Sequence, residues 1–386
     1  MDFQEPEHIR MLRDQLSRFV EEQMPRSAAR TWDKEDTFPR AVFDKLAALG
    51  VMGLTVSEEY GGSGRDILAA MITIEELAKR SLAVAIPYIM CACYGGMNIS
   101  ECGTEEQKRR LLPELAAGRM LFAYGMTEPD VGSDLASVKT RAERTARGIR
   151  INGAKRFCSG PQIANFIYTL VRSGNAADRY RNLSFLLIPP NLPGVHIERM
   201  ESLGMRGVGT TDVTFENVEI PDENLVGGET AWNDAWRMLA GPALDVEKIE
   251  VAAMALGIAS AALLDAWEYS QQRMQFGKAI CAHQAVRHAL ADGHAKLHAA
   301  RLVLYQAAWV ANDNRPCGIE TSIAKLFVCE VAKEVVLSCQ SVMGAYGYIA
   351  ENDMERYVRD ILVTPIIGGS SAIQRNNLSN RLGLPR

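Results

Sequence analysis

The feature that most constrains the fold is a change of hydrophobic period, which occurs twice along the chain. Near the N-terminus, apolar residues recur at three- and four-residue spacing: Ile9, Leu12, Leu16, Phe19 and Val20. This spacing is typical of one buried face of an α-helix. A second helix is expected from Asp66 to Arg80, after a glycine-rich break that punctuates helical sequence. Residues 1–120 are therefore predicted to form a helical domain.

Between residues 121 and 228 the pattern becomes one of short, β-rich runs. Apolar residues alternate through Val213, Phe215, Val218 and Ile220, and the runs NFIYTLV and LSFLLIPP end at turn-forming residues. Short alternating strands separated by turns indicate a β domain, which we expect to be barrel-like.

From residue 229 to residue 386 the sequence returns to a helical pattern. The run AAMALGIASAALLDAWEYSQQR is long and rich in Ala, a strong helix former, and the polar stretch NDNRPCG separates it from further helical sequence. A four-helix bundle is the simplest packing for such helices. The predicted fold is thus mainly α with a central β domain, divided at about residues 120 and 228.

Composition excludes several classes of function. A chain of 386 residues exceeds the usual span of one hydrophobic core, and its net charge of −5 offers no basic field for nucleic acid or an anionic membrane. The N-terminus, MDFQEPEHIRML, has neither the order of a signal peptide nor the composition of a transit peptide. No run approaches the roughly 20 apolar residues that span a bilayer. We therefore expect a cytoplasmic protein without a membrane span.

Metal binding is not expected either. The eight cysteines are scattered and form no C-x-x-C pair, which favours free thiols. His294 and His298 have the spacing of a zinc-binding pair, but the intervening AKL supplies no Glu and no third ligand is evident.

The usual nucleotide and hydrolase motifs are also missing. No G-x-G-x-x-G opens a helix after a strand, and there is neither a Walker loop nor a G-x-S-x-G elbow. The segment LFAYGMTEPDVGSD is more informative, since backbone N–H groups and the hydroxyls of Thr127 and Ser133 suit a polar ring edge or a phosphate. By composition alone, however, it is a turn with a helix cap.

Five motifs, in order and spread over nearly the whole chain, resemble those of the acyl-CoA dehydrogenases. TEPDVGSD is similar to the family's T-E-P-G-A-G-S-D, and INGAKRFCSG to its N-G-x-K-x-W-I-T-N-G. LGMRGVGTTDVTFENVEIP resembles the turn and strand that lead into the second helical domain. RMQFGKAICAHQ is similar to R-x-x-F-G-x-x-x-x-x-x-Q, and SVMGAYGY to Q-x-x-G-G-x-G-Y.

The resemblance implies that FAD is bound by two groups of residues. The first would hold the isoalloxazine ring and the ribityl and phosphate part: Tyr124, Met126, Thr127, Gly132, Ser133, Phe157 and Ser159. In this group Phe157 would stack near the ring and Ser159 would donate to flavin N5. The second would reach the pyrophosphate or adenosine of a flavin held mainly by a neighbouring subunit: Arg273, Phe276, Gln284, Gln340, Ser341, Gly344 and Ser370. Residue type alone would assign Phe157, Phe276 and Gly344 to packing and a tight turn.

The catalytic base departs from the commonest family pattern. Many relatives carry it as the Glu of Y-E-G-T after R-D near the C-terminus, and counting from Arg359 and Asp360 places Gly368 there. A subset that includes isovaleryl-CoA and long-chain dehydrogenases carries the base in L-D-x-E-R, which LDVEK resembles. The spacing from Glu247 to Arg273 (273 − 247 = 26) matches that subset. Crotonobetainyl-CoA reductase-like proteins share the Gly-Gly run. We therefore predict that Glu247 is the base.

A mechanism follows from the resemblance. Glu247 would remove the α-proton of an acyl thioester, and the β-hydrogen would leave as hydride to flavin N5. The backbone N–H of Gly368 would hold the thioester oxygen, since an enolate needs such stabilisation. Asp245, Lys248 and Ser133 would contact the CoA thioester. Lys248 stands where many relatives have Arg and would offer a point charge instead of a bidentate contact.

The favoured function is dehydrogenation of an acyl-CoA to the trans-2-enoyl-CoA by a homotetramer that passes electrons to an electron-transferring flavoprotein. Alternatives are the reverse enoyl-CoA reductase direction, an acyl-carrier-protein thioester as substrate, and a flavin monooxygenase or oxidase on the same scaffold. A flavoprotein that serves assembly or binding, without acyl chemistry, is a further alternative, because a fold by itself does not determine function.

Overall fold

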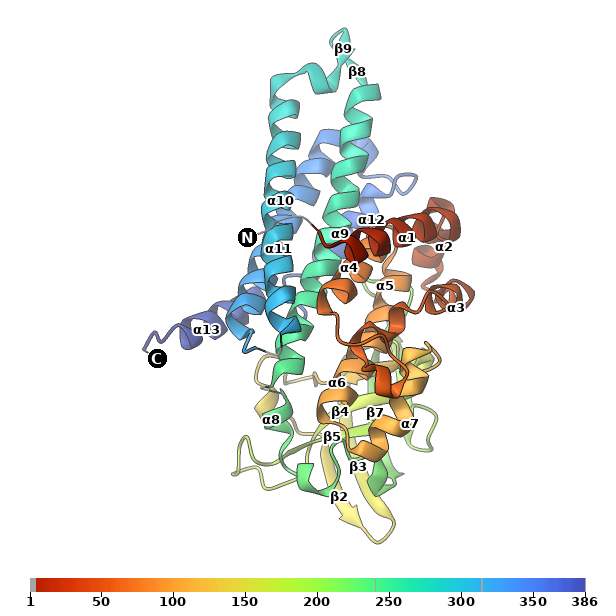
Figure 1. Ribbon diagram of the computed structural model, residues 1–386, viewed down its shortest axis with the longest axis vertical. Coiled ribbons are helices and arrows are strands. Elements are labelled where there is room, and N and C mark those ends of the chain that lie inside the picture. Colours follow the sequence, from red (N-terminus) through yellow and green to blue (C-terminus); the bar gives the residue numbers. More distant parts are fainter. Residues whose placement is uncertain (1–4, 240, 314, 386) are drawn as a thin grey trace.

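The computed structural model describes residues 5–239, 241–313 and 315–385. Helices come first along the chain, a β-sheet follows, and long helices close the sequence. In Figure 1 the sheet lies at one end of an elongated molecule and the long helices extend to the other end, with the N-terminal helices beside both.

The N-terminal helices bury the apolar positions expected from their period. Ile9, Leu16, Phe19 and Val20 are the buried residues of the first helix, and Asp66 caps the fourth by accepting a hydrogen bond from Ala69 N at 2.9 Å. The helices are α1 (Glu7–Gln23), α2 (Arg26–Glu35), α3 (Arg40–Ala47), α4 (Ile67–Ala78), α5 (Leu82–Tyr88), α6 (Asn98–Cys102) and α7 (Glu105–Ala116), with 3-10 turns η1 (Val51–Thr55) and η2 (Glu58–Tyr60) and a π-helix, η3 (Ile89–Met97).

The middle of the chain forms one curled, seven-stranded sheet. Its strands are β1 (Phe122–Gly125), β2 (Arg141–Thr145), β3 (Gly148–Ser159), β4 (Phe166–Arg172), β5 (Leu183–Ile188), β6 (Val195–Met200) and β7 (Thr210–Ile220), with 3-10 turns η4 (Leu135–Ser137), η5 (Pro161–Ile163), η6 (Asp222–Asn224) and η7 (Glu229–Ala231). The strand order is β1-β4-β2-β3-β7-β6, with β5 also paired to β4. The long antiparallel β3–β7 pair sets Ile151 opposite Val218, so alternate apolar side chains face the core.

The C-terminal helices are α8 (Ala235–Leu239), α9 (Pro242–Gln272), α10 (Gln284–Asn312), α11 (Gly318–Met343), α12 (Met354–Ile361) and α13 (Ser371–Arg381). The polar stretch around residues 312–318 separates α10 from α11, as expected. Helices α9, α10 and α11 pack together lengthwise and α13 packs on α11, which gives the predicted bundle. A hairpin of β8 (Met274–Gln275) and β9 (Lys278–Ala279) joins α9 to α10 through η8 (Ile280–Ala282), and η9 (Gly344–Gly347) follows α11.

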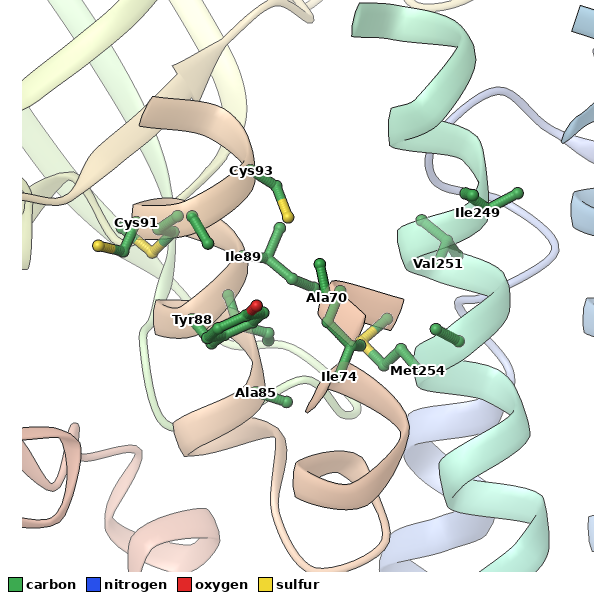
Figure 2. Close-up of a cluster of buried hydrophobic side chains, with 14 of the residues drawn as sticks. Ala70, Ile74, Ala85, Tyr88, Ile89, Cys91, Cys93, Ile249, Val251 and Met254 are labelled. Atoms are coloured by element: carbon green, nitrogen blue, oxygen red, sulfur yellow. The ribbon is translucent and has the colours of Figure 1, made fainter. Parts of the chain in front are cut away.

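Two helical stretches are longer and more apolar than the sequence analysis allowed. Leu82–Cys102 and Asp245–Gln272 both have the length and composition of a membrane span, but 94% and 83% of their most apolar windows are buried inside the fold. They are core helices, because other helices and the sheet already cover their apolar surface. Their mutual approach, seen in Figure 2, brings Cys93 and Ile89 of one toward Ile249 and Val251 of the other.

Candidate active site

Helix α9 carries the predicted base on the face that looks toward η3. Residues three and four apart are neighbours on a helix, so Glu247, Glu250 and Val251 share this face. The opposing η3 is a π-helix of nine residues, Ile89–Met97. Such helices are rare and occur often at functional sites. Figure 2 shows Cys93 on the side of η3 that faces α9.

The carboxyl group of Glu247 is enclosed without a compensating partner. Its side chain keeps partial exposure, but Oε2 is buried and, within the described residues, accepts no hydrogen bond. Burial raises the pKa of Glu247 to about 7, against a smaller lowering by the charge of Lys248. A carboxylate with this pKa is well matched to general-base catalysis near neutral pH.

Gly368 lies against the same face of α9. A Cβ atom added there would stand 2.9 Å from Cγ2 of Val251, one helical turn beyond Glu247. Its φ of +61° is in the left-handed region, which glycine adopts without the steric cost of a side chain. Gln374 holds the loop by donating to the carbonyls of Gly368 and Gly369, each at 3.1 Å. Among the described residues, none accepts a hydrogen bond from the Gly368 N–H.

A buried ion pair holds the segment after β1 in place. Lys155 Nζ contacts Glu128 Oε1 at 2.8 Å and donates to the carbonyl of Met126 at 3.1 Å. Arg156 N donates to the carbonyl of Thr127 at 2.8 Å. Burial lowers the pKa of Lys155 to about 8, against the raising effect of Glu128. These contacts bring Met126 and Thr127 beside the end of β3, where Phe157 and Ser159 lie.

Phe157 offers an aromatic face at the surface. Its side chain is 60% exposed, its φ of +57° is unusual for a bulky residue, and the Arg156 guanidinium carbon lies 5.2 Å from the ring centroid. Backbone strain of this kind clusters at functional sites. Gly132 and Ser133 are exposed as well, on the loop that follows Thr127. An exposed ring beside a loop of hydroxyl and N–H groups fits a planar, phosphate-bearing cofactor.

The predicted adenosine-side residues form a second group at the opposite end of the chain's fold. Arg273 and Phe276 belong to the β8–β9 hairpin, which Figure 1 places far from the sheet, and Phe276 is 91% exposed. The Arg273 guanidinium lies 5.5 Å over the ring of Tyr346, which joins the hairpin to η9. Gln284 begins α10 beside this hairpin. One chain therefore does not bring the two groups together.

The remaining predicted residues near α11 and α13 have local structural roles. Gly344 ends α11 with φ +59°, and Gln340 Nε2 donates to the carbonyl of Gly347 at 3.5 Å. Ser341 donates to the carbonyl of Leu337 within the helix, and Ser370 caps α13 by accepting from Ile373 N. Their predicted contacts with the cofactor stay predictions.

Asp245 and Lys248, the predicted CoA contacts, pair with each other instead of standing free. Lys248 Nζ bonds Asp245 Oδ1, and Arg381 Nη2 contacts both oxygens of Asp245 at 3.1 Å. The side chains of Asp245 and Lys248 are both buried. The pair fixes the first turns of α9 against the C-terminal helix and so holds Glu247 in position. Sequence analysis did not identify Arg381 as a partner, because nothing in its motif links it to α9.

Sequence analysis also missed Cys93, Tyr94 and Glu250. The rings of Tyr94 and Tyr124 are stacked with centroids 3.7 Å apart and planes 10° apart, and the charge of Glu247 contributes to raising the pKa of both, after burial. A Glu three residues after the predicted base, at the start of an apolar helical run, was the available signal for Glu250. Nothing local in the sequence marked Cys93 or Tyr94.

Outside the candidate active site, one surface recess stands out as a place for a second binding site. A recess of about 410 Å³ is lined by Arg147, Arg150 and Glu219 among others, but these groups already form ion pairs with one another. In the part of the chain that the structure describes, no cluster of His, Cys, Asp and Glu has the make-up of a metal site.

Comparison with known proteins assigns the chain to a family along most of its length. Family models described as the N-terminal, middle and C-terminal domains of acyl-CoA dehydrogenase match residues 6–119, 123–218 and 236–383. An acyl-CoA dehydrogenase of Bacillus subtilis is 36% identical over 373 residues, covering 96% of this chain and 97% of that protein. A subunit of the caffeyl-CoA reductase-Etf complex of Acetobacterium woodii is 29% identical, covering 97% of this chain and 98% of that protein.

The same assignment holds for the three-dimensional structure. Butyryl-CoA dehydrogenase from Megasphaera elsdenii superposes with a TM-score of 0.94 at 30% identity, covering 99% of this chain and all of that one. The predicted fold class, the resemblance and the FAD cofactor are thereby confirmed. The chain therefore belongs to the acyl-CoA dehydrogenase family, and it is an FAD-dependent oxidoreductase that acts on the CH–CH bond of acyl-CoA.

Proposed function

We propose that Glu247 is the general base that removes the α-proton of the acyl thioester. The observation that carries this proposal is a buried carboxylate oxygen that has no hydrogen-bond partner among the described residues, on the face of α9 against which the Gly368 loop packs. Its pKa of about 7 allows proton transfer in either direction near neutral pH. At the position where many relatives carry the base, Gly368 has no side chain to share this work.

The other residues hold the thioester while the proton moves. The free N–H of Gly368 donates to the thioester oxygen and stabilises the developing enolate, because a preorganised donor in a site without water is effective. FAD, when bound, supplies the acceptor for the β-hydrogen. Phe157 would stack near its ring, and the Met126–Thr127 segment, held by Lys155 and Glu128, would hold its edge. The Asp245–Lys248–Arg381 cluster would hold the start of α9 in place, and the contacts of Asp245 and Lys248 with the CoA part of the substrate stay predictions.

The separation of the two predicted cofactor groups supports an oligomer. Arg273 and Phe276 lie far from the sheet in one chain, so they would contact FAD bound mainly by another subunit. A homotetramer built as a dimer of dimers, working in the cytoplasm with an electron-transferring flavoprotein as acceptor, is the arrangement we propose. The relative from the caffeyl-CoA reductase-Etf complex supports that partner.

That relative also keeps the enoyl-CoA reductase direction open, since the same Glu247 would then donate the proton to the α-carbon. Two alternatives have less support: an acyl-carrier-protein thioester as substrate, and a flavin monooxygenase or oxidase reaction. An acyl-carrier-protein thioester would use the same base, whereas a monooxygenase or oxidase would give no reason for a buried, unpaired acid at position 247.

The test is an anaerobic titration of the flavin-bound enzyme with a panel of acyl-CoAs, comparing wild type with Glu247→Gln. We expect wild type to bleach the flavin, and the variant to bind the same acyl-CoA but reduce flavin about 10²–10⁴-fold more slowly. Glu268→Gln, an exposed position on the same helix, is the matched control and should behave as wild type. Equal bleaching by wild type and Glu247→Gln would remove Glu247 from the role of base.

A further inference from the structure

Glu250 is a second acid in this site, and proton abstraction does not require it. It lies three residues after Glu247 on α9, is 1% exposed, and has an Oε1 atom without a hydrogen-bond partner within the described residues. Buried polar groups in native proteins are nearly always hydrogen-bonded, so each exception needs a reason. A solvated charge on a helix surface is excluded by the burial of this one.

The surroundings of Glu250 place its carboxyl group between α9 and η3. Among the groups whose pKa is raised in part by its charge are Cys93, Tyr94 and Tyr124, after the larger effect of their own burial. The first two belong to η3 and the third to β1. A hydrogen bond between the Cys93 thiol and the Glu250 carboxyl group links the two elements, so this carboxyl group faces η3, as does the side of α9 that carries Glu247.

Among the described residues, no Lys or Arg forms an ion pair with this acid. Burial, and then the charge of Glu247, raise the pKa of Glu250, and a hydrogen bond with the Cys93 side chain opposes them. The nearby Lys248 is already paired with Asp245. Apart from Glu247, the other charged groups of the site have partners within the chain: Lys155 pairs with Glu128, and Asp245 pairs with Arg381.

An unmodified hydrocarbon acyl group gives no reason for such an arrangement. A buried carboxylate next to methylene groups has no partner and costs free energy. Burial and the charge of Glu247 favour the neutral form of Glu250, and a cationic substituent would favour its ionised form and pair with it. A carboxylate is complementary to an ammonium group and not to an alkyl chain.

We propose that Glu250 is a specificity residue that binds a positively charged amino group on the acyl chain of the substrate. This inference rests on the proposed function of the same site and adds the chemical class of its acyl group. Glu247 removes the α-proton, and Glu250 holds the distal nitrogen, so the two acids on one face of α9 have different tasks.

Binding of unreactive thioethers tests the inference without catalysis. S-(3-aminopropyl)-CoA and S-butyl-CoA differ only by an ammonium in place of a methyl group, as do S-(4-aminobutyl)-CoA and S-pentyl-CoA. Calorimetry on the flavin-bound enzyme should show at least one amine bound about 30-fold or more tightly than its alkyl partner, as expected for a desolvated charge pair. Tighter binding of every alkyl partner would overturn the proposal, and this wild-type comparison depends on no variant.

Glu250→Gln keeps the volume and removes the charge. We expect it to abolish the preference for the amine while leaving or improving the binding of the alkyl thioether, whereas Glu268→Gln should keep the wild-type preference. An unchanged preference in Glu250→Gln would also overturn the proposal. Turnover of 3-aminopropanoyl-CoA and butanoyl-CoA separates the two levels: if neither substrate bleaches the flavin, the proposed function fails, but the thioether ratio still decides whether Glu250 selects a cation.

Discussion

Two regions of this protein bury glutamate on long helices, and they treat it in opposite ways. Glu75 of α4 is fully buried between the N-terminal and C-terminal helices, where Arg301 Nη2 contacts Oε1 at 2.8 Å and Tyr305 donates to Oε2 at 2.8 Å. Burial by itself would raise the pKa of Glu75, but the charges of Arg301 and Arg13 outweigh it and lower that pKa.

Glu250 of α9 is as buried as Glu75, and Glu247 of α9 is partly exposed. Within the described residues neither has an ion pair, each has a buried oxygen without a hydrogen bond, and burial raises the pKa of both. The comparison teaches that burial alone does not mark a candidate functional acid, and that the lack of close ion-pair and hydrogen-bond partners is the additional signal. Glu75 pairs a buried charge across a domain contact, whereas Glu247 has the unpaired carboxylate oxygen that its proposed role as base requires.

The largest expected effect on stability is at the paired acid. Glu75→Gln should lower the free energy of unfolding by about 3–5 kcal/mol, because it leaves the buried side of Arg301 without its counter-charge. Urea denaturation of the flavin-bound protein at neutral pH is the measurement. Glu59→Gln, on an exposed turn, serves as the control. An unchanged denaturation midpoint for Glu75→Gln would mean that this network does not stabilise the domain contact.

Glu247→Gln should raise the free energy of unfolding, in contrast to Glu75→Gln. A folded-state pKa of about 7 lies above the unfolded value, so wild type loses stability as pH rises from about 4.5 to 7 and then levels off. The glutamine variant lacks this loss and should be more stable than wild type at pH 8 by up to about 3 kcal/mol, with little difference near pH 4.5. Parallel denaturation curves at both pH values measure the effect. A variant destabilised at pH 8 would contradict the absence of a partner for this acid.

The same ionisation should appear in catalysis. Because the base must be deprotonated, kcat/KM for flavin reduction should fall about tenfold per pH unit below a limb near pH 7, and should level off above it. Stopped-flow reduction between pH 5.5 and 8.5 with one acyl-CoA checks this, and Glu268→Gln should reproduce the wild-type profile. A flat profile over that range would assign proton removal to a group other than Glu247.

The smallest effect on stability is expected at Gly368, in the loop that packs on the face of α9 carrying Glu247 and Glu250. Gly368→Ala places a residue at φ +61° and sets its Cβ 2.9 Å from Val251 Cγ2, so unfolding free energy should fall by about 1–2 kcal/mol. Gly61→Ala has a similar φ with open space around the added Cβ and isolates the backbone cost. If the two variants lost the same stability, the loop would not be held against α9 as closely as the geometry indicates.

Much of the fold was predictable because local periodicity reflects burial. The stripe from Ile9 to Val20, the helix that starts after Asp66, and the alternation through Val213 and Phe215 all became the expected elements. The base at Glu247 was proposed from a motif and stays a prediction, although its burial is consistent with the role. Two apolar helices were longer than expected, since core helices of a large domain are as hydrophobic as membrane spans.

The sequence by itself determined the order of helical, β and helical segments, the family and the cofactor, because period and motif are local properties of a chain. Only the tertiary structure decided which acids stand alone. Glu75 meets Arg301 across 226 residues, and Glu250 meets Cys93 and Tyr94 of a π-helix more than one hundred residues earlier. The pKa of a buried carboxyl depends on the charges and dipoles that packing brings beside it, and no single-chain pattern specifies those neighbours.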